Sequence, residues 1–229
     1  MLIRYYGSMK KFLQSLTPLT KTTFRKELLK LRQEAHLEHK QALCLQKQIH
    51  LMPDGVLSFF YKNQGVAFFL PKPSLDLIQR EICFHENFWE VELLERVQNL
   101  YDMRGKTVLD IGANIGNHSV FYALVAGASQ VHAFEPQREA ADILARNVKL
   151  NELAGVRVHS VALGEKAETG KIQLLCAGNK GESAVVADAL GDVSSVTLDS
   201  LTLSPDVIKI DVDGAELQVL RGAVDTLKR

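Results

Sequence analysis

The feature that most constrains the fold is an apolar run that leads directly into a glycine-containing turn and then a helical pattern. The run covers residues 107–111, Gly112 and Gly116 lie in the turn, and the helical pattern covers 117–125. Parallel strands need crossover helices, so a chain that repeats this alternation is built from βαβ units. We therefore expect an α/β fold with a mostly parallel sheet. Further strand-length runs and helical patterns follow at 130–134, 138–150, 156–161, 207–210 and 215–227.

The residues before this core are organised differently. A helix is predicted over about 22–48, because Phe24, Leu28 and Leu31 fall roughly on one side of it. Alternating apolar residues around a short polar turn then predict a β-hairpin, and two helices should lead from the hairpin into the core. These strands and helices are predicted at 56–61, 65–70, 76–83 and 90–101.

We divide the chain into a basic helical segment at 1–50, a hairpin with its helices at 51–104, and the α/β core at 105–229. Inside the core, strands at 172–176 and 193–198 are expected to pair antiparallel and to flank a polar loop.

Composition excludes few classes of function. The 27 Lys and Arg residues balance the 27 Asp and Glu residues, so no nucleic-acid partner is expected. The three cysteines have neither metal-site nor disulfide-framework spacing, which favours a reduced, cytoplasmic protein. No apolar run reaches the roughly 18 residues that a transmembrane segment needs. The charge is uneven, since residues 1–50 carry 10 basic and 3 acidic side chains.

The glycine turn after residues 107–111 suits a nucleotide-like ligand, because such ligands bind at the carboxyl ends of parallel strands. A dinucleotide fingerprint needs glycine at 112, 114 and 117, but the chain has Asn114 and Asn117. A nicotinamide-dependent oxidoreductase is therefore a poor alternative. Gly112 and Gly116 fit the turn that binds S-adenosylmethionine, and Asn114 can adopt the left-handed conformation that a glycine would otherwise supply. Asp110 could orient the cationic end of this cofactor through the turn or through water.

A second signal for a nucleoside is Glu135, which follows the predicted strand at 130–134. It lies 23 residues after Gly112, close to the offset of the acidic residue that holds ribose hydroxyls in related folds. A carboxylate can accept hydrogen bonds from two adjacent hydroxyls. Glu135 is therefore a candidate for contact with the cofactor ribose.

The strand at 207–210 ends in clustered charges that are costly to bury unless they pair or face a cleft. Asp211 and Glu216 are candidate general bases for a hydroxyl acceptor. Glu216 could equally stabilise the start of the following helix. Lys209 is either the partner of an acid or a substrate contact. No histidine ligand pattern accompanies these acids, and no metal is expected.

Six segments together resemble the FkbM-type methyltransferases. They occur in the same order as in that family and span roughly residues 80–225. This resemblance implies a Rossmann-like class I methyltransferase core, S-adenosylmethionine as cofactor, and O-methylation of hydroxyls on sugars, glycans or related metabolites. It implies Gly112, Asn114, Gly116 and Glu135 as cofactor contacts, with Ala162 near the adenine. The segments are 108–119, 133–136, 147–151, 162–164, 196–201 and 208–216.

The family pattern would continue beyond the helix at 215–227 with further strands. We therefore expect a sheet in the order 3-2-1-4 with its later strands missing, and a C-terminally incomplete chain. The strand at 207–210 would then have a free edge, through which a homodimer could form. A non-catalytic or incomplete cofactor-binding fragment is the remaining alternative function.

Overall fold

The computed structural model describes residues 18–50, 52–174, 183–187 and 193–229, and the chain divides into two compact units, Met1–Leu43 and Cys44–Arg229. The described part of the first unit belongs to one helix, α2 (Pro18–His50), whose last residues lie in the second unit. Within the first unit Leu29 and Leu31 are exposed. No helix among the described residues is both long enough and apolar enough to cross a membrane.

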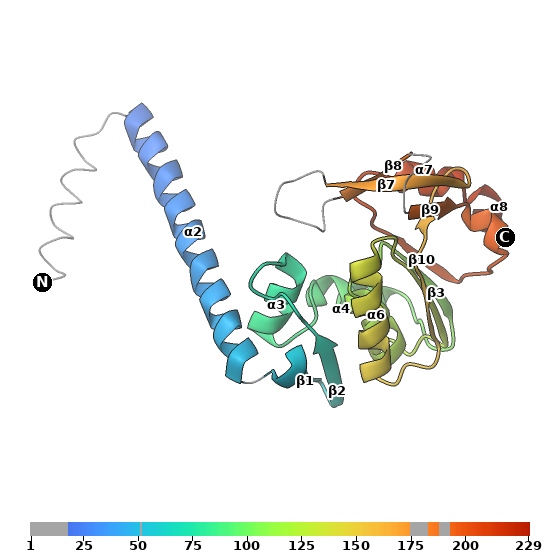
Figure 1. The fold of residues 1–229 in the computed structure, drawn as a ribbon, viewed down its shortest axis with the longest axis horizontal. Coiled ribbons are helices and arrows are strands. Elements are labelled where there is room, and N and C mark those ends of the chain that lie inside the picture. The colour runs from blue at the N-terminus through green and yellow to red at the C-terminus, as the bar shows by residue number, and fades with distance from the viewer. Residues whose placement is uncertain (1–17, 51, 175–182, 188–192) are drawn as a thin grey trace, which may run out of the picture. The chain divides into compact units, whose positions relative to one another are not determined.

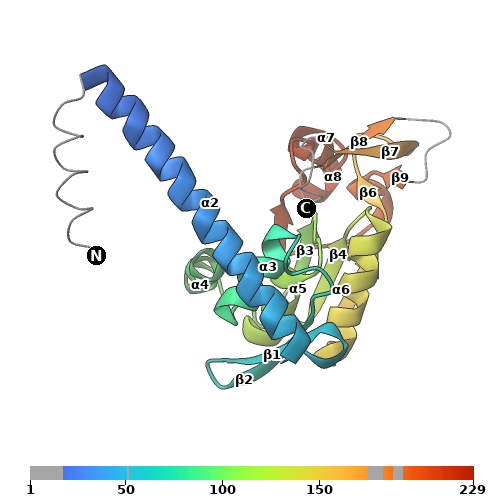
Figure 2. The same cartoon turned by 60° about the vertical axis from the view of Figure 1, so that its left-hand side comes forward.

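A parallel four-stranded sheet forms the centre of the second unit (Figures 1 and 2). Its strand order is β10-β3-β4-β5, and each neighbouring pair is parallel. In chain order this is the predicted 3-2-1-4 arrangement of a Rossmann-like α/β core, and the prediction is confirmed. The strands are β3 (Thr107–Ile111), β4 (Gln130–Phe134), β5 (Val156–His159) and β10 (Val207–Ile210).

Both faces of this sheet are buried. Successive residues of a strand point to opposite sides, so the side chains of one strand belong to two separate clusters. On β3, Val108 packs into a large cluster on one face, whereas Leu109 and Ile111 belong to a second cluster on the other. Helix α6 (Arg138–Leu150) packs beside the sheet and carries the buried Leu144 of the first cluster. Burial on both faces explains why β3 and β4 are mostly apolar, with Asp110 and His132 as their buried polar residues.

The predicted hairpin is present as β1 (Val56–Tyr61) and β2 (Gln64–Phe69), and a short 3-10 turn (Pro53–Gly55) precedes it. It packs against the core through Phe88, whose ring makes edge-to-face contacts with four others at centroid distances of 5.2–5.9 Å. Helices α3 (Leu77–His85) and α4 (Val91–Leu100) flank Phe88 in the chain. The four rings around Phe88 belong to Phe59, Tyr61, Phe68 and Phe121.

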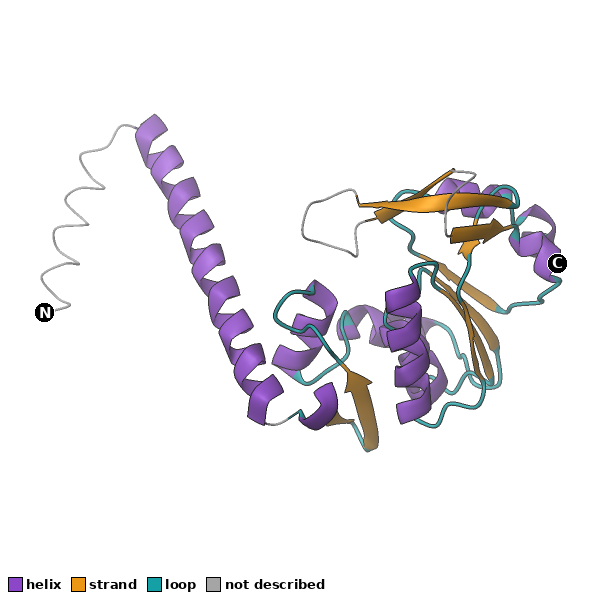
Figure 3. Ribbon diagram, viewed as in Figure 1, coloured by secondary structure: helices purple, strands orange, loops and turns teal. Residues whose placement is uncertain are grey.

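A second sheet, in the order β6-β9-β7-β8, lies beyond the carboxyl ends of the central strands, where Figure 3 shows its arrows in orange. The predicted antiparallel pairing between the strands at 172–176 and 193–198 is present as β7 and β9, although residues 175–176 lie outside the described residues, and the sequence missed the other two strands of the sheet. The strand that contains Ile172 pairs with a strand that was interpreted as loop, and only its first residues pair with Val193–Val196. The missed strand is short and apolar, and its neighbour also carries glycine and polar residues, which obscures the pattern. The strands are β6 (Ala162–Leu163), β7 (Glu168–Leu174), β8 (Ser183–Ala187) and β9 (Val193–Val196).

Two predicted helices are interrupted. The helix after β3 is α5 (Asn117–Val120) followed by a π-helical turn, η2 (Phe121–Val125). The last helix is split into α7 (Glu216–Arg221) and α8 (Val224–Leu227), with Gly222 between them. A Cβ on Gly222 would lie 1.9 Å from the Gly164 carbonyl oxygen, so the backbone approach that breaks the helix needs a glycine. A 3-10 turn, η3 (Leu198–Leu201), precedes β10.

Candidate functional site

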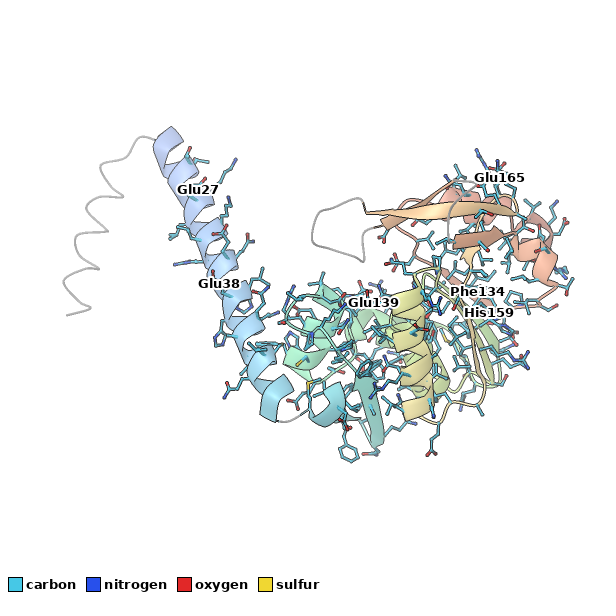
Figure 4. The ribbon with its side chains drawn as sticks, viewed as in Figure 1. Glu27, Glu38, Phe134, Glu139, His159 and Glu165 are labelled. Carbon is cyan, nitrogen blue, oxygen red and sulfur yellow. The ribbon has the colours of Figure 1, made fainter. Side chains whose placement is uncertain are left out.

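A cavity of about 410 Å³ opens at the carboxyl ends of β3, β4 and β10. The turns that follow these strands line it on one side. Residues 161–166, Glu168 and Ser195, in or beside the second sheet, line it on the other. Phe134 and Glu165, both labelled in Figure 4, belong to these two sides. Ligands of open α/β sheets bind at this place, so the topology alone makes the cavity the candidate site.

The glycine turn after β3 forms the floor of the cavity. The Gly112 and Ala113 amides both donate to the Phe134 carbonyl oxygen at 3.0 Å, which fixes the turn to the end of β4. Gly112, Asn114 and Gly116 have φ angles of 77°, 50° and 89°. The predicted left-handed conformation of Asn114 is thus confirmed, and its side-chain oxygen accepts from the Ile115 amide at 2.7 Å.

The two glycines have different neighbours. A Cβ on Gly112 would lie 1.8 Å from the Asp211 carbonyl oxygen, so this glycine brings the β3 and β10 turns together. A Cβ on Gly116 would lie 2.4 Å from Leu144 Cδ1, and Gly116 is not among the residues that line the cavity. Gly112 and Asn114 do line it, whereas Gly116 lets the start of α5 pack closely against α6.

Glu135 lines the cavity at the end of β4, and it is only 4% exposed. One of its carboxylate oxygens accepts from the Asn114 amide at 2.9 Å, and the other accepts from the Gln137 amide at 2.8 Å. Burial raises the pKa of this carboxyl, and these two hydrogen bonds only partly oppose the rise. Glu135 therefore connects the glycine turn to the start of α6 and still presents its carboxylate to the cavity.

Asp110 is fully buried beneath the turn and does not line the cavity. Its carboxylate accepts from the Ser119 hydroxyl at 2.6 Å and forms an ion pair with Lys209 Nζ at 3.0 Å. Burial alone would raise the pKa of Asp110, but Lys209, followed by His118 and Ser119, brings it below the usual value. Lys209 Nζ also donates to the Gly112 carbonyl oxygen at 2.8 Å. The Asp110–Lys209 ion pair is thus bonded to the backbone of the glycine turn through Lys209. This geometry fits the interpretation of Lys209 as the partner of an acid.

The structure separates the two acids that were candidate bases. Asp211 lines the cavity, its side chain is 66% exposed, and it lies 3.8 Å from Lys209 Nζ. Glu216 does not line the cavity. Its carboxylate accepts from the Val212 and Gly214 amides at 3.2 Å each, which supports the turn before α7, and its own backbone amide, followed by these two, lowers its pKa. This geometry fits the second role that the sequence indicated for Glu216, which is to stabilise the start of the following helix.

The other lining residues make the cavity apolar in part and acidic in part. Phe134 and Ala162 supply apolar surface on opposite sides of the cavity. The lining carboxylates outnumber the two lining lysines, Lys166 and Lys209. A cationic ligand is favoured by this balance. The lining carboxylates are Asp76, Glu90, Glu135, Glu165, Glu168, Asp211 and Asp213.

Sequence reasoning missed the side of the cavity that Glu90 and His118 form. His118 Nε2 lies 3.6 Å from a Glu90 carboxylate oxygen, and both residues line the cavity. Asn117 was considered only as a departure from a dinucleotide fingerprint. Its side-chain oxygen accepts from the Trp89 backbone N–H at 2.9 Å, and its side-chain nitrogen donates to the Trp89 carbonyl oxygen at 3.0 Å. No local pattern in the sequence connects residues 89–90 with 117–118, because the contact is tertiary.

This chain is similar in sequence to known methyltransferases. Residues 110–229 match the model of the methyltransferase FkbM domain. The hexuronic acid methyltransferase AglP of Haloferax volcanii is 27% identical over 171 residues, which cover 65% of this chain and 69% of that protein. Methyltransferase 1 of Beauveria bassiana is 26% identical over 170 residues, which cover 59% of this chain and 68% of the relative. Among solved structures, M. jannaschii TYW2 in complex with AdoMet aligns with a TM-score of 0.32 and 18% identity, over 46% of this chain and 43% of that one.

Proposed function

We propose, from the fact that this chain belongs to the FkbM methyltransferase family, that it transfers the methyl group of S-adenosylmethionine to a hydroxyl of a sugar, glycan or related metabolite. The observation that carries this proposal is that Glu135 and the Gly112 turn, which follow two different strands, line one cavity. A buried carboxylate beside a glycine turn suits a nucleoside whose ribose presents two adjacent hydroxyls. The name of the Haloferax relative supports a sugar acceptor.

The residues present fit this cofactor. Glu135 offers a carboxylate for the ribose, the Gly112 turn permits close approach, and Ala162 and Phe134 offer apolar surface to the adenine. Bound S-adenosylmethionine supplies a methyl group on a cationic sulfur, and the acidic lining favours that charge. The chain's own task is mainly to align the acceptor hydroxyl with the methyl group and to exclude water, because alignment removes much of the barrier. Lys209 and Asp110 serve this task by holding the turn from below.

The nicotinamide alternative finds less support. Asn117 replaces the third glycine of a dinucleotide fingerprint, and its side chain is 3% exposed and bonded to the Trp89 backbone. If the chain is instead a non-catalytic fragment, it should bind the cofactor without transferring the methyl group, or neither bind nor transfer. The acceptor, the cytoplasmic location, and a homodimer through the β10 edge remain predictions.

The test of function is transfer of radiolabelled methyl groups from S-adenosylmethionine to a panel of acceptors. The panel should include D-glucuronic acid, D-glucose and disaccharides that contain either sugar. We expect label on a sugar hydroxyl, with S-adenosylhomocysteine formed in equal amount. Product formation with NAD in place of S-adenosylmethionine would favour the oxidoreductase. Binding of S-adenosylmethionine without transfer to any member of the panel would favour the non-catalytic alternative.

Replacing Glu135 with glutamine should weaken S-adenosylmethionine binding about ten- to a hundredfold. A hydrogen bond to a charged group contributes about 1.5–3 kcal/mol, and each 1.4 kcal/mol corresponds to about tenfold in affinity. The measurement is isothermal titration calorimetry, with thermal melts to show that the variant is folded. Glu139→Gln is the matched control, because Glu139 lies in the first turn of the following helix, α6, and does not line the cavity. Equal affinity in folded Glu135→Gln would remove the ribose assignment.

The same binding should depend on pH. The ionised form of Glu135 is the better acceptor, and burial raises its pKa above the ordinary glutamate value. Affinity should therefore fall as the pH drops through that raised pKa, while ordinary glutamates are still ionised. The Glu135→Gln variant should lack this fall. Calorimetry over a pH series that brackets the range from neutrality to the ordinary glutamate pKa measures it, and an unchanged pH dependence in the variant would contradict the assignment.

A further inference from the structure

We propose that His118, positioned by Glu90, is the base that takes the proton of the acceptor hydroxyl. This inference rests on the proposed function, and it assigns to His118 a role that the sequence had given to Asp211 or Glu216. Both His118 and Glu90 line the cavity, on the side formed by α5 and the start of α4. His118 Nε2 faces Glu90 at 3.6 Å, so Nδ1 is the ring nitrogen that remains to accept a proton.

The backbone around Glu90 is built to hold this arrangement. Glu90 has φ 57°, in the left-handed region that a residue with a side chain seldom adopts. The buried Asn117 side chain holds the preceding residue, Trp89, through both its amide and its carbonyl. Because Asn117 and His118 are neighbours in the chain, this clamp brings the Glu90 carboxylate to the imidazole. A strained residue held by a buried amide is typical of positions that serve a site.

His118 is also placed so that it is neutral before the reaction. Its side chain is 12% exposed, and its ring lies 6.0 Å from that of the buried Tyr122. Burial lowers its pKa below the ordinary histidine value, and Lys209 contributes in the same direction. The carboxylates that face it oppose the fall, Asp110 most strongly, then Glu90 and Asp211. The ring is therefore uncharged near neutral pH, and the facing carboxylates stabilise the imidazolium that forms when it accepts a proton.

The step is balanced without a further reactant. The acceptor oxygen forms a bond to the methyl carbon, and the carbon–sulfur bond breaks with its electron pair left on sulfur. The hydroxyl proton passes to Nδ1 of His118, and Glu90 faces the opposite edge of the resulting cation. Asp211 is a weaker candidate, because its side chain is 66% exposed to water and lies 3.8 Å from the Lys209 ammonium, which stabilises its carboxylate. Glu216 is engaged by the backbone of its own turn.

The first test uses histidine NMR and needs no acceptor. In protein labelled with ¹³C-histidine, the His118 resonance is assigned by its loss in His118→Asn, and its pKa is followed by titration. We expect this pKa to fall in Glu90→Gln, because a facing negative charge is removed. We also expect it to be lower in the S-adenosylmethionine complex than in the S-adenosylhomocysteine complex, since the two ligands differ by one methyl cation.

His85 is the matched control for this titration. It also faces a glutamate, Glu81, at 3.4 Å, but it is exposed and does not line the cavity. Its ¹³C resonance at a given pH should be the same in both complexes and in Glu90→Gln. Equal His118 pKa values in the two complexes would overturn the base assignment while leaving cofactor binding intact. If calorimetry shows that neither ligand binds, the proposed function fails together with this inference.

The second test is kinetic, with D-glucuronic acid and D-glucose as probe acceptors. His118→Asn should lower kcat by about 10²–10⁴-fold, the usual contribution of a general base, with cofactor affinity changed less than about twofold. The acidic limb of the pH profile should disappear in His118→Asn and shift to lower pH in Glu90→Gln. His85→Asn should behave as wild type. Retention of the limb in His118→Asn, with its loss in Asp211→Asn, would assign the base to Asp211 and overturn the proposal.

Discussion

Alanine at Gly112 should destabilise the second unit by more than about 4–5 kcal/mol, a loss that few single substitutions reach. Gly112 has φ 77°, and a Cβ at this position would lie 1.8 Å from the Asp211 carbonyl oxygen. The left-handed conformation alone costs about 1–2 kcal/mol for a residue with a side chain. The rest of the loss arises because the Cβ would overlap a backbone oxygen, which cannot rotate away as a side chain can. The turns after β3 and β10 must therefore separate. Urea denaturation followed by circular dichroism measures the loss.

Gly105→Ala is the matched control for this substitution. Gly105 has nearly the same φ, 71°, but a Cβ there would have no atom within 4 Å. Its variant should lose only the conformational cost of about 1–2 kcal/mol and should bind S-adenosylmethionine normally. The difference in stability between the two variants therefore measures the cost of separating the turns after β3 and β10. Equal losses in both would show that the β3 and β10 turns do not depend on contact at Gly112.

Methionine at Lys209 should cost about 3–5 kcal/mol at neutral pH, because it leaves the buried Asp110 carboxylate without its cation. The cost should shrink on acidification. In the wild type the pKa of Asp110 is lowered, so its contribution is present above the unfolded pKa and is lost as the pH falls through the folded one. In the variant the buried carboxylate takes up a proton at higher pH, which removes the uncompensated charge. Denaturation at neutral pH and below the ordinary aspartate pKa measures both effects.

Two further variants identify the cause of that loss. Adding Asp110→Asn to Lys209→Met removes the uncompensated charge and should recover part of the stability. Lys106→Met is the surface control, because Lys106 pairs with Asp206 at 2.9 Å but is 42% exposed, and surface pairs contribute little to stability. If Lys209→Met costs no more than Lys106→Met, the ion pair does not hold the glycine turn.

The sequence predicted those features that depend on local pattern. The bounds of β3, β4 and α6 agree with prediction, because strands buried on both faces are mostly apolar and α6 is amphipathic. Asn114 was expected to be left-handed because asparagine tolerates that conformation. Glu135 was placed at the cavity by its offset from Gly112.

Features that depend on neighbouring strands were not predictable from one sequence. Asp110 was expected to orient the cofactor through the turn or through water, but its burial opposite Lys209, its cross-strand neighbour in the β10–β3 register, was not expected. That register is not visible before the sheet is known. The contact between Glu90 and His118 joins residues that are 28 positions apart. β8 was missed because a five-residue apolar stretch is too short to distinguish from a loop.

The most direct measurement of the central claim is a crystal structure of the protein with S-adenosylhomocysteine. The account predicts the ligand in the cavity at the ends of β3 and β4, with both ribose hydroxyls on Glu135, adenine beside Ala162, and sulfur on the side of His118 and Asp211. A ligand bound elsewhere, or bound in this cavity with its ribose away from Glu135, would contradict the account.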